Sequence, residues 1–410
     1  MSTIRATAPL ALSLPDGRPA AAAWTLDSDS VHINHGSFGA VPLVAQLHQN
    51  ALRAEMDAAP VAWFPALPAR VREARLAIAD FLGVDPGSTA LVPNASGGAS
   101  VVFTSLPVRD GVEIVVTDHG YGAVTMGAER LARRWNGVVR TAHVPLNATA
   151  AEAHDAIMAE VTEATGLIVI DQITSPTARL LPVQSIAAEA RLRGIPTLVD
   201  GAHVPGLYER PLEGLDCDFW IGNLHKFGCA PRGTSALVAQ GPLADELYPL
   251  IDSWGAPHPF PDRFDTQGTL DLTSYLATPT SLDFIEDTWG WDTARSYLTE
   301  LADYAEHTIA AAFGAITGDD HHVDVGMPVN ALRLVRLPVG LAETHADADA
   351  LRDRVVAELG VEGAFTSFEG IGYYRLSTHV YNTSADFDYF AKRCVPALGE
   401  WAREASRARA

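Results

Sequence analysis

Short apolar runs alternate with amphipathic stretches between about residues 85 and 240. The runs are rich in β-branched residues and almost continuously apolar, which is typical of strands buried on both faces of a sheet. They predict strands at 90–92, 112–117, 138–144, 166–170, 196–199, 218–221 and 234–238, with helices at 122–135, 150–164 and 185–193. This alternation indicates an α/β fold with a large, mostly parallel sheet flanked by helices.

The pattern changes after residue 240. Residues 243–268 are rich in proline, glycine and aromatic residues, which favours irregular structure. The remaining sequence predicts helices at 281–313, 346–359 and 384–407 and strands at 330–337 and 372–378. We therefore expect an N-terminal segment (1–30) that packs near the small domain, a large domain (31–275) and a smaller α+β C-terminal domain (276–410).

Composition narrows the class of protein. The 410 residues are 48% hydrophobic and 19% charged, which is ordinary for a globular protein with a large core. A net charge of −21 would repel nucleic acid. The three cysteines lack metal-ligand spacing, so no metal site is expected. The apolar patch at residues 8–14 is too weak for a signal peptide, and no apolar stretch can span a bilayer, so we expect a cytoplasmic protein without a membrane partner.

Lysine is almost absent from the chain. The 29 basic residues include only two lysines, Lys226 and Lys392, and Lys226 lies in a polar turn after the run at 218–221. A lysine amine can lose its proton in a desolvated site and act as a nucleophile, whereas a guanidinium cannot. A surface lysine retained by chance is the alternative, and the residues at the other strand ends argue against it.

Polar residues follow four of the predicted strands directly. They are Asp118 to Tyr121, Asp171 with Gln172, Asp200 to His203, and His225 with Lys226. In an open parallel sheet, ligands bind at the carboxyl ends of the strands, so these side chains are expected to converge. Asp118 and Asp171 also have an ordinary interpretation, because Asp after a strand is commonly a turn former or a helix cap.

An anion site is predicted where the run at 90–92 meets the next helix. Small residues at 95–100 let the backbone approach an anion, and the first-turn N–H groups can bind it together with the Ser96 hydroxyl. An Asn or Ser helix cap explains the segment equally well. Combined with a strand-end Asp and Lys, the segment points to pyridoxal phosphate: the lysine binds the aldehyde carbon, the carboxylate keeps the pyridine nitrogen protonated, and the phosphate anchors the cofactor.

The motifs resemble the class V aminotransferase family of fold-type-I pyridoxal phosphate enzymes, in particular its isopenicillin N epimerase-like branch, with cysteine C–S lyases and cysteine desulfurases as relatives. The matching segments are 32–39, 174–177, 199–203, 223–226, 230–233, 267–271 and 375–382. The resemblance covers nearly the whole chain. It implies the two-domain fold of that group and a homodimer with its active site at the subunit interface.

The resemblance implies a role for each matched residue. Lys226 is the implied cofactor-binding and proton-transferring lysine, Asp200 the partner of the pyridine nitrogen, and His203 a hydrogen-bond partner of the phenolic oxygen. The other implied cofactor contacts are Ser96, Gly97, Gly98 and His225 at the phosphate, Thr269 at the phosphate of the neighbouring subunit, and Tyr121 stacked on the ring. Arg375 is implied to bind the substrate carboxylate, with Asn34, His35 and Ser37 lining the substrate side.

Several departures from the family pattern bear on the reaction. Gln172 stands where His is frequent in this branch; it can hydrogen-bond the ring oxygen but cannot act as an acid or base. Thr266 and Leu270 replace the usual aromatic and basic neighbours of the Gly-Thr motif. Residues 363–374 contain no cysteine, and Cys394 lies in the last predicted helix, so persulfide transfer is not expected.

We therefore expect a lyase that removes the Cα proton of an amino acid and cleaves a C–S bond by β-elimination, acting on an S-substituted cysteine conjugate in specialised metabolism. The alternatives are an epimerase or racemase and an aminotransferase. A DNA-binding regulator is disfavoured because the matched segments already begin at residue 32, and an inactive binding module would not explain Lys226. The distal part of the substrate is expected to contact Trp63, Phe64 and the loop at 254–264.

Overall fold

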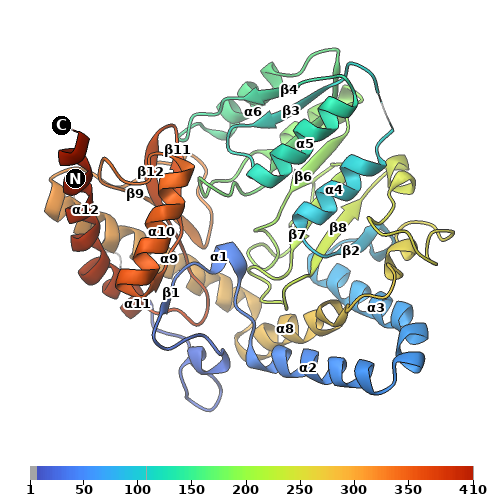
Figure 1. Ribbon diagram of the computed structural model, residues 1–410, viewed down its shortest axis with the longest axis horizontal. Coiled ribbons are helices and arrows are strands. Elements are labelled where there is room, and N and C mark those ends of the chain that lie inside the picture. The colour runs from blue at the N-terminus through green and yellow to red at the C-terminus, as the bar shows by residue number, and fades with distance from the viewer. Residues whose placement is uncertain (1–6, 108, 410) are drawn as a thin grey trace. The chain divides into compact units, whose positions relative to one another are not determined.

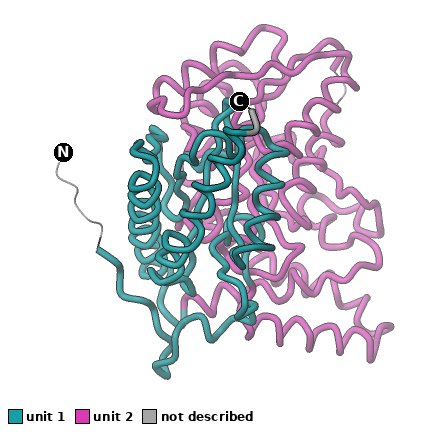
Figure 2. Tube along the Cα trace, turned by 60° about the vertical axis from the view of Figure 1, so that its left-hand side comes forward, with its two compact units in different colours: residues 1–40, 176–179, 287–410 teal, residues 41–175, 180–286 magenta. Residues whose placement is uncertain are grey.

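The computed structural model describes residues 7–107 and 109–409, and the chain divides into two compact units (Figure 2). Unit 1 comprises residues 1–40, 176–179 and 287–410, and unit 2 comprises residues 41–175 and 180–286. These limits differ from the predicted boundaries at 30/31 and 275/276. Residues 31–40 belong to unit 1, where β1 (Val31–His32) pairs in parallel with β10 (Val361–Glu362), and the second limit falls inside α8 (Thr273–Trp289).

A seven-stranded sheet forms the centre of unit 2, in the order β2-β8-β7-β6-β5-β3-β4 (Figure 1). The strands are β2 (Thr89–Val92), β3 (Glu113–Thr117), β4 (Val139–Ala142), β5 (Thr165–Asp171), β6 (Thr197–Asp200), β7 (Phe219–Asn223) and β8 (Ser235–Ala239). The pairs from β4 to β7 are parallel, whereas β8 runs antiparallel to both β2 and β7. The predicted mostly parallel sheet is thus confirmed, and each strand predicted between 85 and 240 is present within a few residues.

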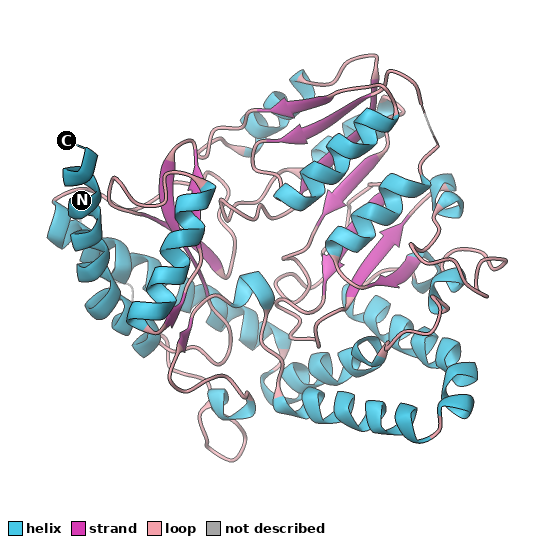
Figure 3. Ribbon diagram, in the orientation of Figure 1, coloured by secondary structure: helices cyan, strands magenta, loops and turns pink. Residues whose placement is uncertain are grey.

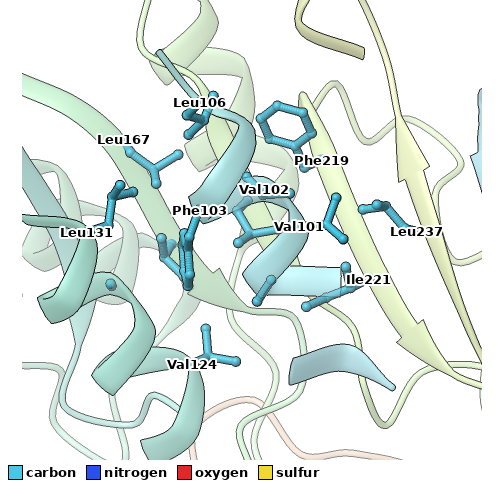
Figure 4. Packing of buried hydrophobic residues seen from close by; sticks show 14 of the residues in the cluster. Val101, Val102, Phe103, Leu106, Val124, Leu131, Leu167, Phe219, Ile221 and Leu237 are labelled. Carbon is cyan, nitrogen blue, oxygen red and sulfur yellow. The ribbon is translucent and has the colours of Figure 1, made fainter. Parts of the chain in front are cut away.

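Helices flank this sheet and bury its apolar runs. They are α2 (Leu43–Ala58), α3 (Pro60–Leu82), α4 (Ala95–Ser105), α5 (Gly122–Arg134), α6 (Ala150–Ala159), α7 (Val183–Leu192) and α8. α4 and α5 pack together, and Figure 4 shows Val102 and Phe103 of α4 meeting Leu131 of α5 and Phe219 of β7. This packing fixes α4 against the sheet and therefore fixes its N-terminus at the end of β2.

Unit 1 contains a three-stranded antiparallel sheet in the order β11-β12-β9 (Figure 3). Its strands are β9 (Leu332–Arg336), β11 (Phe365–Phe368) and β12 (Ile371–Ser377), and its helices are α1 (His35–Phe38), α9 (Trp291–Thr317), α10 (His345–Leu359), α11 (Ser384–Tyr389) and α12 (Val395–Arg409). Two predicted helices are divided. Gly290, with a φ of 77°, separates α8 from α9, and a π-helical turn at Phe390–Cys394 separates α11 from α12. A residue with positive φ cannot continue a right-handed helix.

We expect Gly137→Ala to destabilise unit 2 by about 1–3 kcal/mol, the usual range for overpacking. A Cβ atom at position 137 would lie 1.8 Å from the carbonyl oxygen of Val112, and that backbone atom cannot move aside like a side chain. Urea denaturation would measure the loss. Gly122→Ala is the matched control, because its Cβ would meet nothing within 4 Å. Equal denaturation midpoints for the two variants would contradict the prediction.

Candidate active site

The carboxyl edge of the unit 2 sheet brings together three of the predicted residues. Lys226 lies in the turn after β7, and its Nζ is 3.0 Å from Nε2 of His203, which follows β6. Asp200 is the last residue of β6 and is only 2% exposed. The predicted convergence of these strand-end side chains is therefore present in the structure.

The turn that carries Lys226 is tightly closed. The N–H of Cys229 donates to the carbonyl oxygen of Lys226 at 2.9 Å, and a Cβ atom on Gly228 would lie 2.6 Å from the carbonyl oxygen of Leu224. A Cβ atom on Gly206 would lie 2.5 Å from the carbonyl oxygen of Phe227. Only glycine allows these approaches, so the backbone at Lys226 has little freedom and the amine projects from a fixed point.

The carboxylate of Asp200 has one satisfied and one unsatisfied oxygen. Oδ1 accepts the N–H of Ala202 at 2.9 Å, whereas Oδ2 is buried without a hydrogen-bond partner. Burial raises the pKa of Asp200, and the Ala202 N–H and the positive charge of Lys226 oppose that rise. A buried carboxylate oxygen without a donor is costly, so Oδ2 is suited to receive a charged N–H group, such as a protonated pyridine nitrogen.

Gln172 does not have the arrangement that its predicted role requires. Its Nε2 donates to the carbonyl oxygen of Pro211 at 3.0 Å, and its Oε1 accepts from Nε1 of Trp220 at 2.8 Å. The Trp220 ring in turn fills the space beside Gly201, where a Cβ atom would lie 2.4 Å from Nε1. The Gln172 amide therefore supports the turn after Asp200, and the geometry does not favour a contact with the cofactor ring.

Hydrogen bonds within the protein already engage several amides at the N-terminus of α4. Asn94 caps the helix: its Oδ1 accepts the N–H of Gly97 at 2.8 Å and its carbonyl oxygen accepts the N–H of Gly98 at 2.9 Å. The N–H of Ala95 donates to Oδ1 of Asn223 at 2.8 Å. Within the described residues, the Ser96 N–H is the first-turn amide left for an anion, together with the Ser96 hydroxyl.

The amides of the two glycines at this helix start are engaged by Asn94, and the phosphate contact of Gly97 and Gly98 stays a prediction. Gly98 also has a packing reason, because a Cβ atom there would lie 2.7 Å from Cγ2 of Ile221 on β7. Asn223 was missed by the sequence analysis. The only available signal was its place at the end of the strand that precedes Lys226.

His225 is held in one tautomer. Its Nδ1 lies 3.0 Å from the carbonyl oxygen of Thr234 and must donate, because a carbonyl oxygen can only accept. Burial lowers the pKa of His225 to about 4, and the nearby positive charges of Lys226 and Arg232 contribute. The ring is therefore neutral at pH 7, with Nδ1 protonated and Nε2 carrying the lone pair.

We expect His225 to make the cofactor-free protein less stable in acid. The folded pKa is below the unfolded value of 6.5, so the unfolded state binds more protons between pH 6.5 and about 4, and stability falls as pH falls through this window. The relation between pKa and free energy gives on the order of 2–3 kcal/mol. Denaturation curves at pH 7 and pH 4.5 would show this loss in the wild type and a smaller loss in His225→Gln. Equal losses would contradict the prediction.

In unit 1, three residues predicted to meet the substrate form one network. Arg375 lies on β12 and is 4% exposed, and its Nη2 donates to Oγ of Ser37 at 2.8 Å. The Ser37 hydroxyl donates to Oδ1 of Asn34 at 2.6 Å. This chain of hydrogen bonds orients the guanidinium group.

His35 belongs to the support of that network rather than to a substrate surface. Its side chain is fully buried, Nδ1 lies 2.9 Å from the hydroxyl of Tyr381, and its ring stacks on His379 with centroids 3.9 Å apart. The predicted contact between His35 and the substrate is therefore not favoured. Asn34 and Ser37 remain candidates.

The remaining predicted positions differ in exposure. Tyr121 is 44% exposed at the N-cap of α5, and Thr269 lies in an exposed loop. Trp63 is 3% exposed inside α3, with the Arg70 guanidinium 4.2 Å from its ring centroid, so it is part of the core rather than a substrate contact. Trp254, in the other segment predicted to meet the substrate, is 91% exposed.

Known proteins match most of this chain in sequence. The family model for aminotransferase class-V matches residues 66–390. The chain is 32% identical to isopenicillin N epimerase of Streptomyces clavuligerus over 95% of this chain and 100% of that protein. It is 28% identical to the putative L-cysteine desulfhydrase 1 of Oryza sativa subsp. japonica over 87% of this chain and 80% of that protein.

A solved structure extends the comparison to the fold. The cystine C-S lyase C-DES, in complex with its reaction product cysteine persulfide, superimposes with a TM-score of 0.75 at 18% sequence identity, over 91% of this chain and 98% of that chain. At this identity the likeness concerns the fold, and it confirms the predicted α/β class. The sequence matches set the class more narrowly: this chain belongs to the class V aminotransferase family.

Proposed function

We propose that the protein is a pyridoxal phosphate-dependent lyase that cleaves the C–S bond of an S-substituted cysteine by β-elimination. Pyridoxal phosphate is the cofactor, held by Lys226, by Oδ2 of Asp200 and by the Ser96 amide and hydroxyl. The observation that carries the proposal is the 3.0 Å contact between Nζ of Lys226 and Nε2 of His203, which provides a proton-transferring pair next to an unsatisfied carboxylate.

Pyridoxal phosphate, when bound, supplies an electron sink that acidifies the Cα–H bond of the amino acid. The amine of Lys226 takes the Cα proton, the C–S bond breaks, and its electron pair leaves with sulfur. The ammonium of Lys226, with His203 within hydrogen-bond distance, returns a proton to the thiolate. Water completes the balance, so one conjugate and one water give a thiol, pyruvate and ammonium.

Proton NMR in D2O tests the reaction directly. The purified protein, loaded with pyridoxal phosphate, would be incubated with a panel of S-alkyl cysteines and with the corresponding S-alkyl homocysteines as controls that cannot undergo the same β-elimination of a thiol. Pyruvate and free thiol from the cysteine series alone are expected. Intact cysteine conjugates that carry deuterium at Cα in both configurations would contradict the lyase and establish an epimerase.

An epimerase is the second candidate, favoured by the 32% identity with isopenicillin N epimerase over the full length of that protein. Epimerisation needs a proton donor on the face of Cα opposite the lysine. We assign this role to the phenol of Tyr121, which is 44% exposed at the N-cap of α5. Tyr121→Phe would separate the two candidates, because it would abolish epimerisation while leaving elimination by the Lys226–His203 pair active.

A homodimer completes the proposed site. The loop with Thr269 is exposed, and near it a cavity of about 310 Å³ is lined by Pro93, Gly97, Leu250, Ile251, Leu270 and Leu272. Leu250 and Ile251 are 52% and 46% exposed, and such an apolar patch favours a protein partner. Sedimentation is expected to show a dimer that Ile251→Asp weakens together with cofactor affinity. A monomeric active wild type would contradict this arrangement.

In the stretches that the structure describes, no helix combines the length and the apolar character needed to cross a bilayer. We propose that the enzyme acts in the cytoplasm on a small amino-acid conjugate of specialised metabolism, with neither nucleic acid nor membrane as a partner. Fractionation of the producing cells would test the location.

A further inference from the structure

A second buried carboxyl group lies beside Asp200. Asp171 ends β5 and Asp200 ends β6, and the two residues are direct partners in the parallel ladder. Asp171 is 6% exposed and Asp200 is 2% exposed. Partner residues in register point to the same face of a sheet, so the two carboxyl groups are neighbours in a site from which water is largely excluded.

The two carboxyl groups have different hydrogen bonds. Asp200 leaves Oδ2 open, whereas the Asp171 side chain accepts the backbone N–H of Tyr121. Tyr121 begins α5 after a tight turn in which the N–H of Gly120 donates to the carbonyl oxygen of Thr117 at 3.1 Å. A Cβ atom on Gly120 would lie 2.9 Å from Oγ1 of Thr125. Asp171 therefore ties the end of β5 to the turn that carries Tyr121.

Two adjacent buried carboxyl groups cannot both be ionised without a large repulsion, and one of them keeps its proton. The charged groups that act on Asp171 are Asp200 on β6 and Lys226 after β7, and the turn after β3 contributes the Tyr121 N–H. Burial raises the pKa of Asp171 well above its usual range, and the negative charge of Asp200 raises it further. Burial raises the pKa of Asp200 as well, but the N–H of Ala202 and the positive charge of Lys226 oppose that rise.

We infer that Asp171 is a positioning residue, a neutral carboxylic acid that fixes the turn of Tyr121 and leaves Asp200 as the single negative charge available to the pyridine nitrogen. Only the contact between Asp200 and the pyridine nitrogen rests on the proposed function. The sequence predicts that Asp171 and Asp200 end strands at the same edge of the sheet, but it does not show that they are direct partners in the ladder, so the ordinary role of a turn former stays open for Asp171.

Infrared spectroscopy of the cofactor-free protein tests the protonation state independently of the proposed function. At pH 7.5, which is about three pH units above an ordinary carboxyl pKa, the wild type is expected to show the carbonyl stretch of a protonated carboxylic acid, and Asp171→Asn is expected to lack it. Absence of this band in the wild type, or its persistence in Asp171→Asn, would overturn the inference. Failure of the protein to bind pyridoxal phosphate would leave this measurement unaffected.

Hydrogen exchange and the cofactor spectrum test the positioning role. Asp171→Asn keeps an acceptor for the Tyr121 N–H and no charge, so the exchange rate of that amide and the pH titration of the bound cofactor's absorbance should match the wild type. Asp171→Leu removes the acceptor and should speed exchange at Tyr121 by about tenfold or more. If Asp171→Asn shifts the absorbance titration by a pH unit or more, Asp171 is ionised in the wild type and acts on the cofactor through its charge. The inference then fails. If Asp171→Leu does not fold, the Asp171→Asn titration decides alone.

Discussion

Lys226→Ala is expected to lower the turnover of S-alkyl cysteines by about 10³-fold or more and to remove the visible absorbance of the lysine-bound cofactor. The loss follows because the same amine binds the cofactor and carries the substrate proton. Lys226→Arg should fail to a similar degree although it keeps the positive charge, since a guanidinium does not lose its proton at neutral pH. Steady-state kinetics and absorbance spectra would measure both effects.

The chain provides a matched control for this experiment. Lys392, the other lysine, has a side chain that is 80% exposed and lies 3.9 Å from the Asp388 carboxylate, so Lys392→Ala should keep full activity and the absorbance band. A Lys226→Ala protein that retains the band would show that the cofactor is bound elsewhere or not covalently, and the proposed site would then be wrong.

Asp200→Asn is expected to have opposite effects on activity and on stability. Activity should fall by about 10²–10³-fold, because the amide provides no negative charge to hold a proton on the pyridine nitrogen. The cofactor-free protein should be as stable as the wild type or more stable by about 1 kcal/mol, because the substitution removes a buried charge whose Oδ2 has no donor. Stopped assays and urea denaturation of the cofactor-free protein would test the two effects separately.

This pairing of effects distinguishes a functional carboxylate from a structural one. Asp218 is the comparison beside the same sheet: its Oδ2 accepts the backbone N–H of Thr197 at 2.8 Å, so Asp218→Ala, which removes that acceptor, should cost stability and leave the activity of the folded protein unchanged. If Asp200→Asn loses stability as Asp218→Ala does, the unsatisfied oxygen of Asp200 has an internal role, and the proposed cofactor contact loses its support.

The local sequence pattern was sufficient to predict the strands and to place Lys226, Asp200 and His203 at one edge of the sheet. The buried strands of unit 2 are continuous apolar runs that end in polar residues, and the topology of a parallel sheet places those ends on one edge. The division at Gly290 was missed because the amphipathic pattern of 281–313 continues through it. Helix α3 was not among the predicted elements; it contains Pro65 and Pro68, which ordinarily interrupt a helix.

Several of the predicted site residues have contacts with residues far apart in sequence that the sequence does not indicate. Gln172 forms hydrogen bonds with Trp220 and Pro211, and Ile221 leaves room only for glycine at position 98. The surroundings of these two residues therefore cannot be inferred from their sequence neighbours. The motif at 32–39 predicts a substrate contact for His35. Its ring stacks instead on His379, more than 340 positions away in a chain of 410 residues. Such pairings depend on tertiary packing, and a single sequence does not reveal them.

Strand β8 lies between β2 and β7 and runs antiparallel to both. Its late place in the sequence determines when the site can form during synthesis. Among the residues that the structure describes, β2 forms ladder hydrogen bonds with β8 alone, in register from Thr89 with Val238 to Val92 with Ser235. A ribosome adding about 5–20 residues per second therefore takes about 7–30 s to deliver the partner of β2 after β2 itself has emerged. Throughout that interval β2 is an unpaired apolar strand. The anchor for the cofactor phosphate is thus among the last parts of the sheet to form, and chaperone binding to the nascent chain should be concentrated there.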